Sequence, residues 1–188
     1  MRDYGYLFLL IASSEARARR IMTGCQDALK IEDRALLAHR YSTRSEPAPY
    51  EVPLSPAEFT SRQEFGCFLL DWEHNQLRFG LGVELDRWLD GGLNVVALGH
   101  SRVLEPARRR YGPHLRVVYA PGGKDPRRWL DRVLSGRTVR FRQLGLGFND
   151  GHSFNGPIDG LQLDEDYPAA IRQLTGWMQQ DDPPALAA

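Results

Sequence analysis

Cysteine is scarce in this sequence, and no apolar run approaches the thickness of a bilayer. Cys25 and Cys67 are its only two thiols, and they form neither a CxxC pair nor a metal-ligand spacing. We therefore expect free thiols in a reducing compartment and no metal site. The apolar run from Tyr6 to Ala12 is too short to cross a membrane, and it lacks the length and cleavage site of a secretory signal. These absences predict a cytoplasmic protein without a membrane partner.

The sequence also lacks an excess of charge of one sign. Its 24 Lys and Arg residues balance 24 Asp and Glu residues, which provides no electrostatic footprint for nucleic acid. Local arginine clusters, as at 108–110, are typical of solvated helix faces. A chain of 188 residues suits one domain, for which we predict residues 1–180, followed by a disordered tail at 181–188.

Glycine is missing from the stretch where it would matter most. Residues 6–22 pass from an apolar segment through small residues ending at Ser14 into a basic, helix-like segment. Strand, tight turn and helix is the order in which phosphate-binding loops are built. No glycine lies between Gly5 and Gly24, however, and the stretch contains no Gly-Lys-Ser/Thr. It is either a nucleotide site that has been lost or one that never existed.

Strand and helix signals alternate along the chain. Short apolar runs predict strands, and apolar positions at helical spacing predict helices. The expected strands lie at 6–11, 35–42, 67–72, 76–80, 94–99, 116–121 and 160–163, and the expected helices begin at the caps Ser14, Ser55, Ser101 and Asp125 and near residues 83 and 168. This alternation predicts an α/β three-layer sandwich with a mainly parallel sheet.

Two segments are expected to be irregular. Residues 44–53 contain three prolines and should form a loop or lid, and the glycine-rich residues 144–160 should form a loop. Ligands of parallel sheets bind beyond the carboxyl ends of the strands. The turns after Ile11, Leu98 and Ala120 should therefore converge on a cleft.

The middle of the chain resembles a known family. The segments YSTR, LSPAEF, FLLDWEHNQLRFGLGVELDRWLDGGLNVVALGHSR and ARRRYGPHLRVV are similar to the ribose 1,5-bisphosphate phosphokinases, a guanylate-kinase-like family of bacterial phosphonate breakdown. The resemblance runs nearly without gaps from Arg40 to Tyr119. It implies a P-loop NTPase or nucleoside-monophosphate-kinase-like fold, with 45–80 as a small inserted acceptor-binding lid region. It also implies transfer of the ATP γ-phosphoryl group to a sugar phosphate.

The family's phosphate loop, G-x-x-x-x-G-K-[ST], falls on Ile11 to Arg19 of this chain. Both glycines are replaced by residues with a Cβ, the lysine becomes Arg17, and the metal-binding hydroxyl is missing. A Cβ costs roughly 1–2 kcal/mol at each left-handed position, so the usual loop path is disfavoured. Ser13 and Ser14 could offer a hydroxyl only along a different path. The comparison predicts a degenerate nucleotide loop comprising Ser13, Ser14 and Arg17, and no cofactor.

The acceptor side retains candidate ligand-binding residues. Arg40 and Arg44 stand where the guanylate-kinase group holds an acceptor phosphate, and guanidinium groups suit phosphate oxygens; alternatively, they are exposed strand-end charges. Asp71 and Glu73 share one side of a strand and are similar in position to the carboxylate that recognises the acceptor. Alternatively, they are edge charges that discourage aggregation. Asn75 is a further candidate ligand or a turn residue.

The turn after residues 94–99 carries His100, Ser101 and Arg102, which should reach the cleft. The family's Ser-Arg pair aligns with His100-Ser101 without a gap, or with Ser101-Arg102 after a slip of one residue. His100 could accept a proton, so we take it as a candidate catalytic residue together with Asp71 and Glu73. A helix-capping or buried structural role for His100 is the alternative.

Three functions stay open after this comparison. The first is a degenerate relative of the kinase that binds a phosphorylated sugar or nucleotide in a regulatory or accessory role, with a protein partner or as a homodimer. The second is an active kinase with a non-standard loop, which would use Mg-ATP. The third is an enzyme of another class in a remodelled cleft. In related kinases lid arginines close over the transferred phosphate, and the resemblance places Arg137 and Arg140 there.

Overall fold

The central element of the protein is a five-stranded parallel sheet. The computed structural model describes residues 4–120, 145–147, 153–157 and 160–184. The sheet has the strand order β11-β8-β1-β7-β2, with every neighbouring pair parallel. Its strands are β1 (Leu7–Ala12), β2 (Ala35–Leu37), β7 (Asn94–Leu98), β8 (Leu115–Ala120) and β11 (Leu161–Gln162). The predicted mainly parallel sheet is confirmed.

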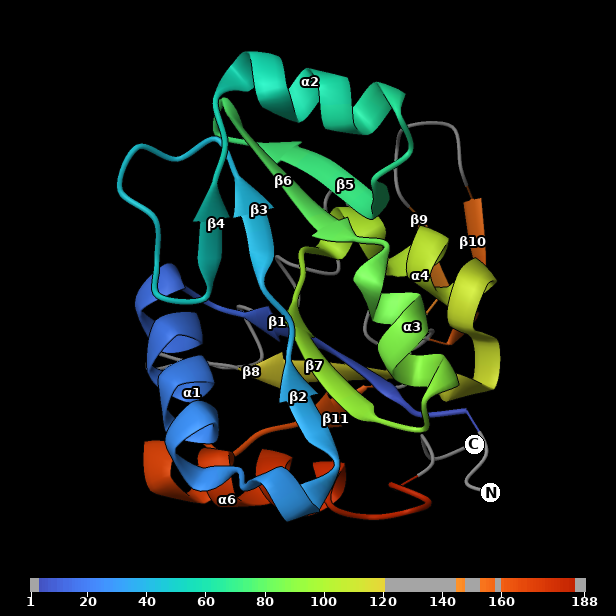
Figure 1. Ribbon diagram of the computed structural model, residues 1–188. Coiled ribbons are helices and arrows are strands. Elements are labelled where there is room, and N and C mark those ends of the chain that lie inside the picture. The colour runs from blue at the N-terminus through green and yellow to red at the C-terminus, as the bar shows by residue number, and fades with distance from the viewer. Residues whose placement is uncertain (1–3, 121–144, 148–152, 158–159, 185–188) are drawn as a thin grey trace.

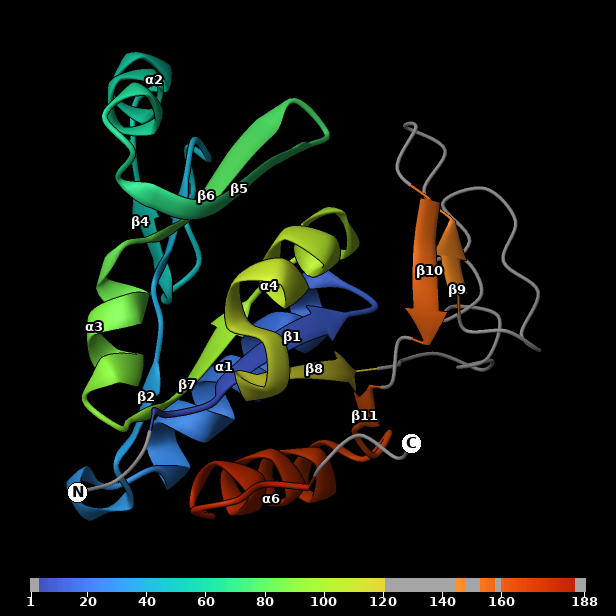
Figure 2. The same cartoon turned by 90° about the vertical axis from the view of Figure 1, so that its right-hand side faces the viewer.

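Helices cover one face of this sheet, and helices with a second sheet cover the other (Figures 1 and 2). Side chains of a strand alternate between its faces. Phe8 and Leu10 of β1 therefore pack toward α1 (Glu15–Ala28) and α6 (Tyr167–Met178), whereas Leu7, Leu9 and Ile11 pack toward α3, α4 and the second sheet. Here α3 is Glu84–Asp90 and α4 is Leu104–Tyr111. The predicted three-layer α/β sandwich is confirmed.

The second sheet is mixed and contains four strands in the order β4-β3-β6-β5. Its strands are β3 (Arg40–Ser42), β4 (Glu51–Pro53), β5 (Phe68–His74) and β6 (Leu77–Gly82), and α2 (Pro56–Glu64) lies beside it in Figure 1. The predicted hairpin is present as β5 and β6. Its turn residues Asn75 and Gln76 have φ values of 50° and 63°, as a two-residue turn that follows the strand twist requires.

Two predictions for residues 35–53 were wrong in part. The single strand expected at 35–42 divides at Ala38 and His39, because Ala38 N–H still donates to Val96 O of the central sheet whereas Arg40 N–H donates to Tyr50 O of the second. The Pro-rich segment 44–53 does not stay irregular to its end, since β4 pairs with β3. Pro53 is tolerated there because β4 is an edge strand of its sheet.

Two further predictions need correction. The helix expected to begin at Ser101 begins at Leu104, after the short 3₁₀ turn η2 (Ser101–Val103). The glycine-rich segment 144–160 is not wholly loop, because β9 (Gly145–Gly147) and β10 (Ser153–Pro157) form an antiparallel pair. Backbone groups alone form a strand ladder, so weak β-propensity does not forbid it.

Some predictions concern residues outside the described ranges. They are the helix expected at 125–136, the lid arginines Arg137 and Arg140, and the last four residues of the tail. Earlier in the tail, Asp182 accepts a hydrogen bond from the Tyr6 hydroxyl at 3.1 Å and Pro183 O accepts one from Arg116 at 3.4 Å. Among the described residues, no helix combines the length and apolar character needed to cross a membrane.

Candidate functional site

The connection between β1 and α1 consists of only two residues, Ser13 and Ser14. The backbone of both residues and the side chain of Ser14 bond within the chain. Ser13 N–H donates to Ala120 O at 3.0 Å, and Ser14 Oγ accepts from Arg17 N–H at 3.1 Å. Ser14 O accepts from Ala18 N–H at 3.0 Å. Ser14 thus caps the helix, as the sequence predicts.

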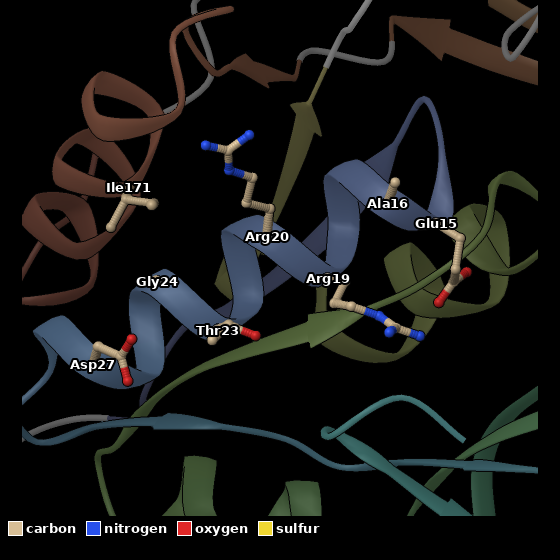
Figure 3. A pocket seen from close by; sticks show the side chains of 8 residues that line it. All are labelled: Glu15, Ala16, Arg19, Arg20, Thr23, Gly24, Asp27 and Ile171. Carbon is tan, nitrogen blue, oxygen red and sulfur yellow. The ribbon is translucent and has the colours of Figure 1, made fainter. Parts of the chain in front are cut away.

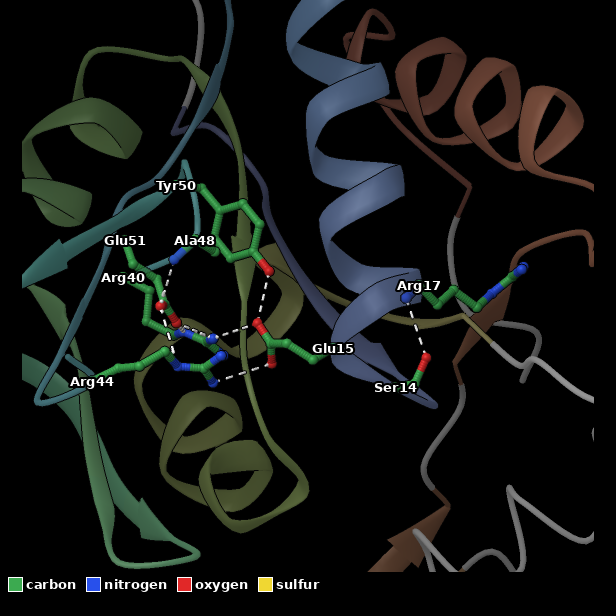
Figure 4. Close-up of polar contacts among 8 residues, drawn as sticks. All are labelled: Ser14, Glu15, Arg17, Arg40, Arg44, Ala48, Tyr50 and Glu51. Atoms are coloured by element: carbon green, nitrogen blue, oxygen red, sulfur yellow. Dashed lines mark hydrogen bonds and ion pairs between the residues drawn. The ribbon is translucent and has the colours of Figure 1, made fainter. Parts of the chain in front are cut away.

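The guanidinium group of Arg17 points away from the acceptor-side arginines (Figure 4). Arg17 is only 4% exposed. It donates to the backbone oxygens of Asp164 and Glu165, the latter at 2.9 Å, and its Cζ lies 4.9 Å from the Tyr167 ring centroid. These contacts tie α1 to the segment between β11 and α6.

Arg40 and Arg44 lie between two carboxylates, Glu15 of α1 and Glu51 of β4 (Figure 4). Arg40 Nε donates to Glu51 Oε1 at 3.0 Å, and its Nη2 pairs with both Glu51 and Glu15, the latter at 3.2 Å. Arg44 reaches Glu15 at 3.6 Å and Glu51 at 3.5 Å. The structure therefore brings the two predicted arginines together, and gives both the same pair of partners.

Strand register explains how this cluster is assembled. Parallel pairing of β3 and β4 places Arg40 opposite Glu51. Glu51 also accepts Ala48 N–H at 3.0 Å, so its fully buried side chain (0% exposed) is satisfied on both oxygens. The Tyr50 hydroxyl donates to Glu15 Oε1 at 2.9 Å. Burial, assisted by the Glu15 carboxylate, raises the pKa of Tyr50, so the phenol stays a donor at neutral pH.

Glu15, Tyr50 and Glu51 are absent from the sequence-based set of site residues. A sequence signal was available only for Glu15. Glu15 is an acidic residue in the first turn of a helix, directly after the cap. The helix dipole stabilises a carboxylate at this position. Tyr50 and Glu51 follow the prolines of a segment expected to be loop, and only the β3–β4 register makes them neighbours of Arg40.

Asp71, Glu73 and Asn75 lie on or after β5, on its solvent-exposed side. Asp71 accepts a hydrogen bond from Gln63 of α2 at 2.6 Å, and Glu73 lies opposite Arg78 of β6. Within the described part of the chain, no hydrogen bond or ion pair joins these residues to Arg40 or Arg44. The acidic pair is therefore separate from the arginine cluster in its polar contacts.

His100 caps the turn after β7 and faces a second histidine. Its Nδ1 accepts Arg102 N–H at 3.2 Å, and Ser101 Oγ lies 3.5 Å from the same nitrogen. The ring centroid of His100 is 4.7 Å from that of His74, at the end of β5. Burial, with the positive charges of His74, Arg102 and Arg40, lowers the pKa of His100 to about 4. His100 is therefore neutral at pH 7.

A groove of about 710 Å³ runs along α1 beside α6 (Figure 3). It is lined by Glu15, Ala16, Arg19, Arg20, Thr23, Gly24, Asp27 and Ile171. Glu15 marks the end of this groove that lies at the start of α1, and the same side chain reaches the arginine cluster. In the described residues, no three His, Cys, Asp or Glu side chains are grouped so that they could hold a metal ion.

The fold is that of a guanylate kinase. A superposition on the crystal structure of guanylate kinase from Anaplasma phagocytophilum covers 68% of this chain and 67% of that one, with a TM-score of 0.54 and 12% sequence identity. At that identity the likeness concerns the fold alone. It confirms the predicted P-loop NTPase-like, guanylate-kinase-like fold.

No family model matches the sequence, but individual relatives do. The proteins named ribose 1,5-bisphosphate phosphokinase PhnN are 44% identical over 81 residues in Pectobacterium atrosepticum and 43% identical over 96 residues in Dickeya zeae. These matches cover 42% and 49% of this chain, and 43% and 51% of those proteins, so about half of each relative or less is matched. The protein of that name in Achromobacter xylosoxidans is 35% identical over 136 residues, covering 72% of this chain and 69% of its own length. With more than two thirds of both chains matched in that pair, this chain belongs to the family of ribose 1,5-bisphosphate phosphokinases.

Proposed function

We propose that this protein binds a phosphorylated sugar through Arg40 and Arg44, and that it has lost the ATP chemistry of its family. It would act in a regulatory or accessory role in phosphonate metabolism, with a protein partner or as a homodimer. One observation carries the proposal: only Ser13 and Ser14 connect β1 to α1, at the place where the family's phosphate loop falls.

The residues at this connection do not fit a magnesium-bound nucleotide. A phosphate loop needs several backbone N–H groups turned inward on the phosphates, whereas those of Ser13 and Arg17 donate to Ala120 O and Ser14 Oγ. Arg17 is engaged with backbone oxygens of the β11–α6 segment. The nearest carboxylate, Glu15, would repel a polyphosphate. These residues are therefore poorly suited to phosphoryl transfer from ATP.

The acceptor side supports retained binding. Two guanidinium groups can give a phosphate several charge-assisted hydrogen bonds, and the Tyr50 hydroxyl supplies a neutral donor beside them. Arg40 is held by a buried carboxylate, which fixes its direction before a ligand arrives. A site of this composition suits the phosphoryl group of a sugar phosphate, the class of acceptor named in the relatives.

The two other hypotheses have less support. An active kinase would need Arg17, Ser13 or Ser14 to replace the missing parts of the loop. The Arg17 guanidinium is already engaged with backbone oxygens, and Ser14 Oγ caps α1. Another enzyme class would need His100 to act with Asp71 and Glu73. His100 faces His74, and Asp71 bonds to Gln63.

Calorimetric titration with two ligands tests the proposal. We expect ribose 1,5-bisphosphate to bind the wild-type protein and Mg-ATP to give no heat of binding. Arg44→Ala should abolish the sugar-phosphate signal, and Arg109→Ala, a change of the same kind at an exposed helical ion pair, should leave it intact. Tight binding of Mg-ATP would restore the kinase hypothesis, and binding of neither ligand would refute the proposal.

A further inference from the structure

Glu15 occupies an unusual place for a charged residue. It is the first residue of α1, yet its side chain reaches across to the second sheet. There it accepts hydrogen bonds from Arg40 at 3.2 Å and from the Tyr50 hydroxyl at 2.9 Å, and it pairs with Arg44 at 3.6 Å. Two guanidinium groups and a phenol are the donors that a phosphoryl group would use. A carboxylate of the chain itself receives them instead.

The two carboxylates of the cluster differ in how firmly they are held. The side chain of Glu51 is 0% exposed, accepts a hydrogen bond from Arg40 and accepts a backbone N–H on its other oxygen. The side chain of Glu15 is 38% exposed, and among the described residues it pairs only with side chains that a ligand could also use. Glu51 therefore belongs to the frame of the site, whereas Glu15 can turn into solvent without leaving a buried charge behind.

The charges of the cluster cancel. Arg40 and Arg44 contribute two positive charges, and Glu15 and Glu51 contribute two negative ones. An anion that enters while Glu15 stays in place meets no net attraction. Without Glu15 the cluster carries one net positive charge. The electrostatic free energy gained by an anion that displaces Glu15 therefore depends on the charge of that anion.

We propose that Glu15 is an internal competitor for the phosphoryl position of the acceptor site, and that it makes the site selective for phosphomonoester dianions. The inference rests on the proposed function, since it concerns the same arginines. A singly charged phosphodiester or carboxylate would exchange one negative charge for another and lose its freedom of motion, with no electrostatic gain. A dianion adds a charge to the same donors, and only this class of ligand profits from displacing Glu15.

Two small esters distinguish the charge classes without any sugar contacts. At pH 8 methyl phosphate carries two negative charges and dimethyl phosphate carries one. Binding of each is followed by NMR titration of the wild-type protein, Glu15→Gln, Glu15→Ala and Arg44→Ala. Glu58→Gln is the matched control, because Glu58 is also an acidic residue in the first turn of a helix and pairs with an arginine, Arg62.

We expect the wild-type protein to bind methyl phosphate and not dimethyl phosphate. In Glu15→Gln and Glu15→Ala, methyl phosphate should bind about tenfold more tightly, and dimethyl phosphate should become detectable. Glu58→Gln should behave as wild type, and Arg44→Ala should bind neither ester. Glu15→Ala shows whether the introduced amide of Glu15→Gln has an effect of its own. Thermal unfolding of each variant establishes that it is folded.

The possible failures are distinguishable. If both Glu15 variants bind the two esters as the wild-type protein does, and Arg44→Ala abolishes binding, the competitor role is wrong while the proposed function stands. If the ratio of the two affinities is unchanged in a tighter-binding variant, the selectivity is wrong. If no folded variant binds methyl phosphate or ribose 1,5-bisphosphate, the proposed function falls, and this inference with it.

Discussion

The start of α1 and the β3–β4 edge are both rich in polar side chains, but their polar groups are satisfied in different ways. At the start of α1, Ser14 and Arg17 bond to backbone groups that belong to the helix and to the β11–α6 segment. At the β3–β4 edge, Arg40 and Arg44 form ion pairs with carboxylates. A ligand can compete with the half-exposed carboxylate Glu15, whereas competing with the backbone would mean opening the helix. The first region is therefore structural, and the second can still exchange partners.

The largest effect should come from breaking the frame of the second region. Arg40→Ala leaves the buried Glu51 with only Arg44 at 3.5 Å and one backbone N–H. Removing one partner of a buried ion pair typically costs about 3–5 kcal/mol. We expect a loss near the lower end of that range in the free energy of unfolding, measured with urea.

Arg109→Ala provides the control for this change. Its guanidinium group is exposed and pairs with Glu105 one helical turn away, so its loss should cost about 0.5 kcal/mol or less. Equal losses for the two variants would mean that Arg40 is no more structural than a surface charge, and the contrast between Glu51 and Glu15 would fail.

The next effect tests whether Arg17 belongs to the structural region. Arg17→Ala removes hydrogen bonds to two backbone oxygens and the contact with Tyr167, so we expect a loss of about 2–3 kcal/mol. The affinity for ribose 1,5-bisphosphate should not change. Arg19→Ala, at an exposed position of the same helix, should alter neither quantity. A weaker affinity with unchanged stability would instead make Arg17 a ligand residue.

Much of the fold follows from local signals in the sequence. Uninterrupted apolar runs such as Leu7–Ile11 and Val95–Leu98 can only be buried on both faces, which is the property of a central parallel strand. Ser14 and Ser55 cap their helices as their positions suggest. Where the chain changes sheets at Ala38 and His39, no local signal marks the change, because it is made by hydrogen bonds to distant strands.

The candidate site was less accessible to sequence reasoning. Arg40 and Arg44 can be identified as candidates because arginine commonly binds phosphate. Their partners depend on the pairing of β3 with β4 and on the position of α1, which are long-range features. Glu15 lies 25 positions from Arg40 along the chain, and the two meet only because the fold brings the start of α1 near β3. The sequence therefore indicates the hydrogen-bond donors of the site, whereas the carboxylate that competes for them can be identified only from the structure.

The third effect concerns His100, which follows β7 of the central sheet and contacts His74 of the hairpin. Its pKa falls from 6.5 to about 4 on folding, so the unfolded chain binds its proton more readily. The stability linked to neutral His100 is complete above pH 6.5 and is lost as the pH falls to about 4. Allowing for partial exposure, we expect a loss of about 2 kcal/mol over this window.

His100→Asn isolates this contribution from that of the carboxylates. Asparagine is a good helix cap and cannot titrate, so it can accept Arg102 N–H as the histidine does. Urea unfolding from pH 7 to pH 4 should show a shallower acid loss for the variant. Identical pH profiles for the two proteins would show that another group causes the loss.

The smallest effect separates the two regions by ligand affinity. Ser14→Ala and Ser55→Ala each remove one cap hydrogen bond of 3.1 Å, and each should cost about 1 kcal/mol of stability. Ser14 caps the helix that begins with Glu15, whereas Ser55 caps α2. Loosening the first turn of α1 should weaken the hold of Glu15 on Arg40 and Arg44, so ribose 1,5-bisphosphate should bind Ser14→Ala about twofold more tightly and Ser55→Ala unchanged. If the Ser14 hydroxyl instead held a phosphate, as in a working phosphate loop, its removal would weaken binding. The sign of this small change therefore decides whether the start of α1 opposes the ligand or receives it.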